Sequence, residues 1–289
     1  TNSLDELYLN IEKNAANAMD ALGNGATQGL KLAANIGAML IAFISILSMI
    51  NFTLEYYPMI SKDVLQGPWA GLPVAWNDDL SFDEVAYRSD LISTCAAGVP
   101  GVYTAGTTGE FYAMEFDEWK IITRVTVEEC KRAGTPVMIG VTSTYTLGAV
   151  KRAAFAAELG ADAIQVALPY WMEMDDRMIL PFFQEITEVC RDVALSIYET
   201  RRTKTILTLE QHREVFDSTG SYLAVKSNEG TLGCSPEGCR QLSKFVNVWV
   251  GEDKFNALGP YGAIGSASAL LYMNPRIILY MFDLLCRKK

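Results

Sequence analysis

Residues 71–106 read GLPVAWNDDLSFDEVAYRSDLISTCAAGVPGVYTAG, and this stretch decides the fold. It begins with a short apolar run, GLPVAW, at 71–76 and ends with a second one, GVYTAG, at 101–106. Between them lies an amphipathic stretch that starts at a capping signal, Ser81–Glu84, and stops at Gly98. Short apolar runs separated by a helix are typical of parallel strands covered on both faces, so the stretch predicts one β–α–β unit.

The same alternation continues towards the C-terminus. Helix start signals occur at Thr208–Gln211 and Ser235-Pro236-Glu237, and stop signals occur at Gly134 and Gly160. Eight evenly spaced strand–helix units predict an α/β fold, a closed (β/α)₈ TIM barrel over residues 61–289. An open doubly wound sheet is the alternative, but no G-x-G-x-x-G follows the first strand. The other apolar runs are PVMIGV (136–141), AIQVAL (163–168), ALSIYE (194–199), YLAVKS (222–227), VNVWVG (246–251) and GAIGSA (262–267).

The first 60 residues follow a different pattern. Residues 32–54, LAANIGAMLIAFISILSMINFTL, carry no charge and form a run long enough for a transmembrane helix. Because the pattern changes after Pro58, we expect residues 1–60 to form a separate hydrophobic helical segment that precedes the barrel. Two interpretations stay open for this segment: a working membrane anchor, or a fused piece without a role in a membrane.

Composition excludes several classes of function. The net charge of −10 argues against nucleic acid as a partner, because phosphate binding needs clustered Lys and Arg. The only histidine, His212, lies in a polar-rich helical stretch, so we expect it to face solvent and expect no metal site. The cysteines are scattered and match no common zinc pattern, which indicates a reducing compartment and a cytoplasmic barrel. They are Cys95, Cys130, Cys190, Cys234, Cys239 and Cys286.

Lys226 is the most informative residue at the carboxyl ends of the strands, where barrel active sites gather. It follows four apolar-rich residues on a strand that should be buried, and burial lowers the pKa of an amine. A neutral amine can attack a ketone carbon. The alternative is a lysine at a strand tip that reaches solvent or pairs with Glu229.

Two neighbouring strands end in residues that suit such chemistry. The turn Gly106-Thr107-Thr108-Gly109 offers two hydroxyls and close backbone approach, which can hold a carboxylate. Tyr198 supplies a phenol that can move protons beside a cationic or imine nitrogen. The alternative for each is structural: a common glycine turn, and a tyrosine that closes the barrel rim.

At residues 67–276 the chain resembles the dihydrodipicolinate synthase and N-acetylneuraminate lyase family. The stretches that carry the resemblance are residues 71–111, ELGADAIQVALPYW (158–171) and GPYGAIGSASALLYMNPR (259–276). The resemblance implies a dimeric or tetrameric barrel that condenses or cleaves pyruvate adducts. It also implies Lys226 as the Schiff-base lysine and Tyr198 as the proton shuttle.

By position, the resemblance matches Thr107 and Thr108 to threonines that bind the substrate carboxylate and relay the proton, and Tyr170 and Trp171 to the aromatic pair after the fourth strand. The further substrate-binding candidates are Gly106 and Gly109 of the turn, Gly265 in the last strand, and Arg201 and Arg202 beside the altered motif.

The chain departs from the family pattern around the second substrate. The motif Tyr-Asn-x-Pro is replaced by Tyr198-Glu199-Thr200-Arg201, and no arginine stands in the family's register, although Arg201 and Arg202 are close. Ser227-Asn228 replaces the acidic residue that usually follows the lysine. The family's C-terminal helical extension is not present before Lys289. The imine step is therefore expected, with a second substrate other than aspartate semialdehyde.

These observations predict a class I aldolase or lyase that acts on pyruvate or a related 2-oxo acid and an aldehyde. No cofactor is expected, because the protonated imine serves as the electron sink. A homo-oligomer is expected from the resemblance. The alternatives are a membrane-tethered or inactive barrel that only binds, and a nucleoside-transporter fragment fused to a barrel. The last one follows from residues 24–51, which resemble a stretch of the concentrative nucleoside transporters.

Overall fold

The computed structural model describes residues 16–55 and 59–287, and the chain divides into two compact units, residues 1–57 and 58–289. Pro58, where the sequence pattern changes, lies outside the described residues. Each unit is described by itself.

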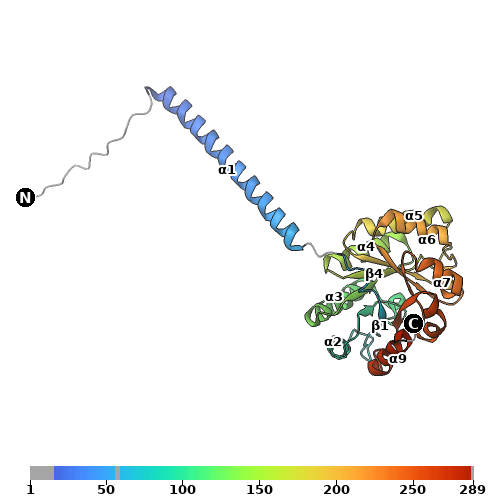
Figure 1. The fold of residues 1–289 in the computed structure, drawn as a ribbon. Coiled ribbons are helices and arrows are strands. Elements are labelled where there is room, and N and C mark those ends of the chain that lie inside the picture. Colours follow the sequence, from blue (N-terminus) through green and yellow to red (C-terminus); the bar gives the residue numbers. More distant parts are fainter. Residues whose placement is uncertain (1–15, 56–58, 288–289) are drawn as a thin grey trace, which may run out of the picture. The chain divides into compact units, whose positions relative to one another are not determined.

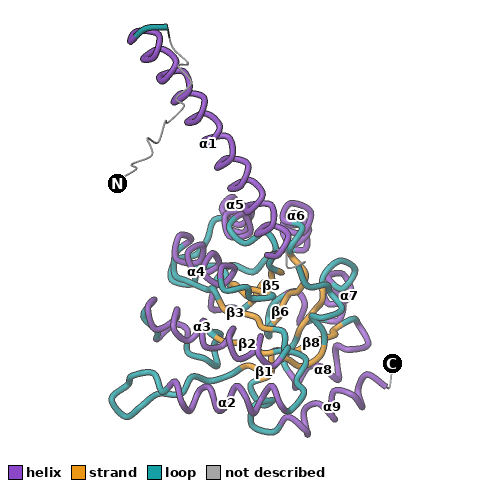
Figure 2. The backbone as a smooth tube through the Cα atoms, turned by 90° about the vertical axis from the view of Figure 1, so that its left-hand side faces the viewer, coloured by secondary structure: helices purple, strands orange, loops and turns teal. Residues whose placement is uncertain are grey.

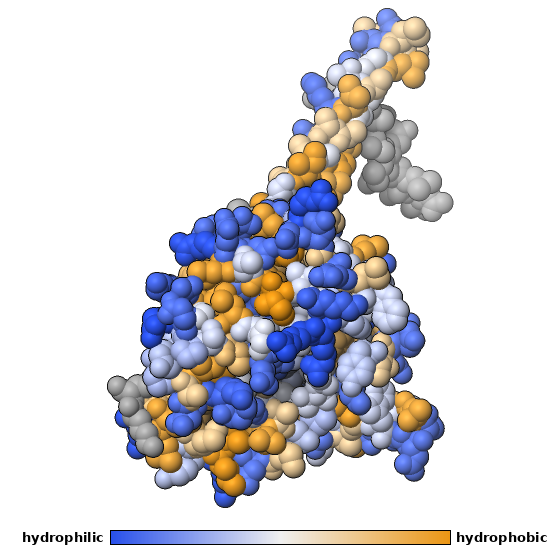
Figure 3. Space-filling view, turned by 90° about the vertical axis from the view of Figure 1, so that its right-hand side faces the viewer, coloured by the Kyte–Doolittle hydropathy of each residue, from blue (hydrophilic) through white to orange (hydrophobic). Residues whose placement is uncertain are grey.

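The first unit contains one long helix, α1 (Ala18–Glu55). Its apolar side chains are exposed as far as Leu47, for example Met39 at 73% and Phe43 at 60%. Within the described residues, this is the one helix long and apolar enough to cross a membrane; the span is Ala18–Leu47, and its most apolar 18-residue window has a mean hydropathy of 2.0. That span begins earlier than the run at 32–54 and includes Lys31. Figure 3 shows apolar residues along much of the α1 surface.

The second unit is a closed parallel barrel whose strands follow chain order, with helices around it (Figures 1 and 2). This confirms the predicted TIM barrel. The strands are β1 (Gly67–Gly71), β2 (Val102–Thr104), β3 (Val137–Gly140), β4 (Ala163–Val166), β5 (Ala194–Glu199), β6 (Tyr222–Ser227), β7 (Asn247–Trp249) and β8 (Ala263–Ser268).

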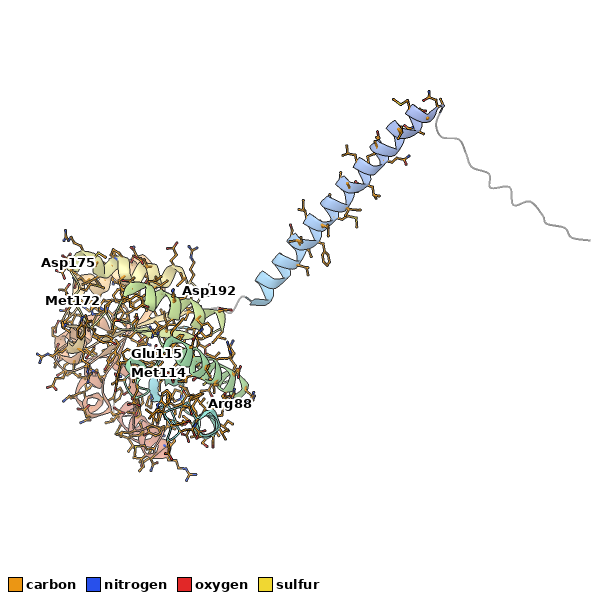
Figure 4. The ribbon with its side chains drawn as sticks, turned by 180° about the vertical axis from the view of Figure 1, so that it is seen from behind. Arg88, Met114, Glu115, Met172, Asp175 and Asp192 are labelled. Atoms are coloured by element: carbon orange, nitrogen blue, oxygen red, sulfur yellow. The ribbon has the colours of Figure 1, made fainter. Side chains whose placement is uncertain are left out.

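The helices between the strands begin largely where the sequence indicates. Thr208 and Gln211 form the predicted capping box, and Ser235 caps the next helix with Pro236 at its first turn. The helices are α2 (Glu84–Ala96), α3 (Phe116–Ala133), α4 (Thr146–Glu158), α5 (Asp176–Glu188), α6 (Leu209–Thr219), α7 (Pro236–Leu242), α8 (Glu252–Leu258) and α9 (Pro275–Arg287). Arg88 on α2 is labelled in Figure 4, and its guanidinium forms ion pairs with Glu84, Glu128 and Glu129.

Two local predictions were wrong. The first strand is Gly67–Gly71 and not the run at 71–76, because Pro73 lacks the N–H that would continue the ladder. The helix that follows is capped by Asp83, whose side chain accepts from the Ala86 N–H, and not by Ser81. The observed strand therefore ends at Gly71, and the observed helix is capped two residues later than predicted.

The prediction that His212 faces solvent was also wrong, since the side chain is fully buried. His212 lies with Val215 on the face of α6 that packs onto the barrel, and its Nδ1 is 2.7 Å from the Tyr222 hydroxyl. The Tyr222 hydroxyl on β6 gives His212 a buried partner, so its side chain can point inward. The polar sequence of the helix does not reveal this partner.

Two apolar clusters stabilise the barrel. The larger one lies between strands and helices. The smaller one fills the barrel interior and includes Trp69, Met138, Leu223 and Trp249, with the two indole rings 5.6 Å apart. Its members come mainly from the amino-terminal parts of the strands. The opposite end is therefore left free for a site.

Candidate active site

Lys226 and Tyr198 stand side by side at the carboxyl ends of β6 and β5. The two residues are partners in the parallel ladder, and the lysine Nζ lies 4.5 Å from the centre of the phenol ring. Burial lowers the pKa of the Lys226 amine below its usual value, and Arg202 lowers it further. Tyr198 and Glu252 act in the opposite direction without cancelling this effect. The direction of this pKa shift favours the neutral form of the amine.

The Tyr198 phenol oxygen has two hydrogen-bond partners. Its oxygen accepts a hydrogen bond of 2.8 Å from the Asn228 amide, and Thr107 is a further hydrogen-bond partner. Burial acts to raise the pKa of the phenol, but the Lys226 charge and these two hydrogen bonds outweigh it, so the pKa is lowered. A phenol with a lowered pKa beside a lysine with a lowered pKa is suited to exchanging protons.

The turn after β2 has an unusual backbone. Ala105 and Glu110 flank it, and both adopt the left-handed region, with φ of 52° and 54°. Residues without glycine's freedom are strained there, and such strain is concentrated at functional sites. A Cβ on Gly106 would lie 2.4 Å from the Tyr103 hydroxyl, so only glycine fits at the first position of the turn.

Two further residues of this turn, Thr108 and Gly109, lie close to the end of β1. A Cβ on Gly109 would lie 3.2 Å from the Leu72 carbonyl oxygen, and one on Gly71 would lie 3.6 Å from the Thr108 hydroxyl. The turn is therefore packed against the first strand, which fixes the position of its hydroxyls and N–H groups.

A cavity of about 310 Å³ opens beside Tyr198, the neighbour of Lys226. Of the predicted site residues, Thr107, Tyr198, Tyr170 and Arg202 line it. The amine of Lys226 lies against the ring of Tyr198, which forms part of the wall. The other lining residues are Phe111, Tyr112, Thr142, Ala167, Thr200 and Thr203.

Lys226 and six of the predicted substrate-binding residues do not line this cavity; the six are Gly106, Thr108, Gly109, Trp171, Arg201 and Gly265. Arg201 lies against Gly230, where an added Cβ would be 2.2 Å from its Nε. Trp171 is 74% exposed. Gly265 faces the barrel interior, where a Cβ would lie 2.3 Å from the Trp249 indole nitrogen. Close packing against Trp249 thus explains why a glycine stands at position 265.

Sequence reasoning missed two polar residues of the site. Asn228 was noted only as a departure from the family, although its amide bonds the Tyr198 hydroxyl. Glu252 begins α8 directly after β7, and its Oε1 is buried with no hydrogen-bond partner in the described part of the chain. Its position after a strand end was the available signal. No cluster of potential metal ligands occurs among residues 16–55 and 59–287.

Comparison with protein families gives two matches. The profile of the dihydrodipicolinate synthetase family matches residues 65–287, most of the chain. The profile described as the Na⁺-dependent nucleoside transporter C-terminus matches residues 3–94, which include α1.

Individual relatives agree with the first match. The 4-hydroxy-tetrahydrodipicolinate synthase of Anaplasma marginale (strain Florida) is 31% identical over 223 residues, which cover 76% of this chain and 72% of the relative. The enzyme of the same name from Helicobacter pylori (strain HPAG1) is 25% identical over 228 residues, or 76% and 75% of the two chains.

Solved structures share the fold. CdNal from Clostridium difficile, in complex with mannosamine, superposes with a TM-score of 0.71 at 23% identity and covers 77% of each chain. Dihydrodipicolinate synthase from Aquifex aeolicus gives a TM-score of 0.72 at 21% identity, over 77% of this chain and 76% of the other. The profile match and the relative of 31% identity establish that the chain belongs to the dihydrodipicolinate synthetase family of Schiff-base-forming lyases and aldolases.

Proposed function

We propose that the barrel is a class I aldolase or lyase that forms an imine between Lys226 and a 2-oxo acid such as pyruvate. The observation that carries the proposal is the Lys226–Tyr198 pair, with the amine 4.5 Å from the ring centre beside a cavity of about 310 Å³. Burial lowers the pKa of Lys226, which favours the neutral, nucleophilic form of the amine.

The proposed reaction uses only protein side chains. Lys226 Nζ attacks the oxo carbon, the carbinolamine loses water, and a protonated imine forms. Loss of a proton from the adjacent carbon gives an enamine, which attacks the carbonyl carbon of the aldehyde; cleavage runs the same steps in reverse. Tyr198, with Thr107 as its hydrogen-bond partner, moves the protons. The turn at 106–109 holds the substrate carboxylate through the Thr107 and Thr108 hydroxyls and backbone N–H groups.

The second substrate is proposed to carry an anionic group and to differ from aspartate semialdehyde. Arg202 is the cationic residue that lines the cavity, where it stands with Tyr112 and Tyr170. Arg201 is turned to Gly230, and Glu199 faces away from the cavity towards α6. Condensation of pyruvate with aspartate semialdehyde at a turnover typical of enzymes, about 1–10³ s⁻¹, would contradict this proposal.

Borohydride trapping tests the imine. The protein is mixed with pyruvate, glyoxylate or 2-oxobutyrate, reduced, and measured by intact mass and peptide mapping. We expect one reduced adduct, located on Lys226. No adduct with any of the three acids, or an adduct on a surface lysine such as Lys151, would leave a barrel that only binds.

We also propose that α1 tethers the barrel to a membrane. The support is its exposed apolar surface, its length and the transporter-profile match over residues 3–94. Partition of the full chain into the aqueous phase without detergent would contradict this. The expected homo-oligomer stays a prediction, which sedimentation of the detergent-solubilised chain can check.

A further inference from the structure

A buried polar cluster lies directly behind the proposed imine site, and the reaction described above does not use it. Its centre is Glu199, whose side chain is 1% exposed, and the fully buried His212 lies with its Nε2 at 3.3 Å from the Glu199 Oε1. This nitrogen forms no hydrogen bond within the described residues, so Glu199 contacts it by proximity alone. On the far side of the ring, Nδ1 is 2.7 Å from the Tyr222 hydroxyl.

The carboxylate of Glu199 connects four parts of the barrel. Its Oε1 accepts a hydrogen bond of 3.2 Å from the Leu207 N–H, at the end of the loop before α6. Its Oε2 is 3.5 Å from the Ser227 hydroxyl on β6. With the contact to His212 on α6, one side chain on β5 thus joins the neighbouring strand, the loop and the helix. A buried carboxylate is costly unless it is partnered in this way.

Strand geometry links this cluster to the site. Glu199 and Ser227 are partners in the ladder one step after Tyr198 and Lys226. Successive side chains point to opposite faces of a strand. Glu199 and Ser227 therefore face α6, while Tyr198 and Lys226 face the barrel interior. The Asn228 N–H donates to the Glu199 carbonyl oxygen at 3.3 Å, while its amide bonds the Tyr198 hydroxyl at 2.8 Å.

The loop that Glu199 anchors forms one wall of the cavity. Thr200, Arg202 and Thr203 line the cavity. Further along, the loop makes polar contacts through Lys204 with the Trp171 carbonyl and through Thr205 with the Met174 carbonyl. The Leu207–Glu199 bond is the contact that ties its end to the strand carrying Tyr198.

We propose that Glu199 is a positioning residue whose contacts with His212, Leu207 and Ser227 hold Tyr198 and the loop at 200–206 in place against Lys226. The inference rests on the proposed imine chemistry for its catalytic consequence. Its structural consequence, a fixed loop, is independent of that chemistry. A positioning group should affect the rate of imine formation more than the affinity for the 2-oxo acid.

The test compares two isosteric changes of buried carboxylates in the full chain. Glu199→Gln removes the charge beside the site. Glu129→Gln is the matched control, because Glu129 is equally buried, pairs with Arg88 and Arg132, and lies in the last turns of α3. Two readouts are used: trypsin cleavage within the loop, after Arg201, Arg202 or Lys204, and borohydride trapping over a range of pyruvate concentrations.

For Glu199→Gln we expect loop cleavage to be about tenfold faster and saturated trapping about tenfold slower, as for the loss of a charge-assisted hydrogen bond. The half-saturating pyruvate concentration should change less than about threefold. Glu129→Gln should lower the melting temperature and leave both readouts within about twofold. Unchanged cleavage and trapping in Glu199→Gln, or equal changes in Glu129→Gln, would overturn the inference.

Tyr222→Phe is the second variant, and it decides the matter if Glu199→Gln does not fold. It removes only the hydroxyl that partners His212. We expect smaller changes in the same direction, and unaltered loop cleavage would overturn the inference. Absence of any adduct in the unmodified chain would refute the imine proposal, whereas the cleavage comparison would still decide the role of Glu199.

Discussion

The two ends of the barrel interior are built from the same eight strands but from different residues. Towards the amino-terminal end, large apolar side chains fill the space, with Trp69, Met138 and Trp249 fully buried. Towards the carboxyl-terminal end, β5 and β6 present Tyr198 and Lys226, and a cavity remains. The first end contributes stability through packing, and the second contributes the capacity for chemistry at some cost in packing.

This difference teaches how to separate the two roles by experiment. A change at the packed end should act on the free energy of unfolding, and a change at the open end should act on the reaction. The predictions below test that separation in order of decreasing effect.

Lys226→Ala should have the largest effect, the complete loss of the borohydride adduct. None of the described residues that line the cavity is a lysine, so no other amine there should replace Lys226 and the loss should be complete. The melting temperature should change little, because the substitution removes an amine that is costly to bury. A clear fall in melting temperature would show that the lysine contributes to packing, and it would contradict the separation of stability and reaction between the two ends.

Trp69→Ala should lower the free energy of unfolding by about 3–5 kcal/mol, the usual cost of a large cavity in a core. Trp69 is fully buried and packs on Trp249 with ring centres 5.6 Å apart. Denaturant titration measures the loss. The protein that remains folded should trap pyruvate at nearly the normal rate, and a greatly reduced rate would mean that the two ends are coupled.

Tyr198→Phe should still give the adduct, but about 10²-fold more slowly, as expected when a general acid–base group is removed. The ring that packs beside Lys226 is kept, and only the hydroxyl that bonds Asn228 is lost. Quenching the trapping reaction at successive times measures the rate. A normal rate would assign the proton transfers to another group.

Charge changes around Lys226 should move the pH dependence of trapping in opposite directions. The neutral amine reacts, so the rate rises with pH around the pKa of Lys226. Arg202 lowers this pKa, hence Arg202→Gln should shift the profile to higher pH. Glu252 raises it, so Glu252→Gln should shift the profile to lower pH. Shifts in the same direction for both variants would contradict the proposed arrangement of charges.

Deletion of residues 1–57 should have the smallest effect on the barrel. The described part of α1 has no buried side chain as far as Leu47, whereas Met59 and Ile60 pack against the interior cluster. The deletion should therefore end at residue 57, before these two residues. Both melting temperature and trapping rate should be unchanged; loss of the cooperative thermal transition would show that the segment belongs to the core.

The sequence by itself determined the architecture and the main chemistry. The apolar runs at 194–199 and 222–227 coincide with β5 and β6, because a strand buried on both faces leaves a continuous apolar signal. This signal, together with the family resemblance, placed Lys226, Tyr198 and Thr107 at one end of a barrel. The ladder brings the first two into register.

Only the tertiary structure decided which polar residues face the site and which face the core. Arg201 and Arg202 are adjacent and indistinguishable in the sequence, yet one lies on Gly230 and the other lines the cavity. His212 has the sequence surroundings of a surface residue and is fully buried beside Glu199. The direction of a polar side chain depends on partners distant in the sequence, because a buried polar group is tolerated only where another element supplies its hydrogen bonds.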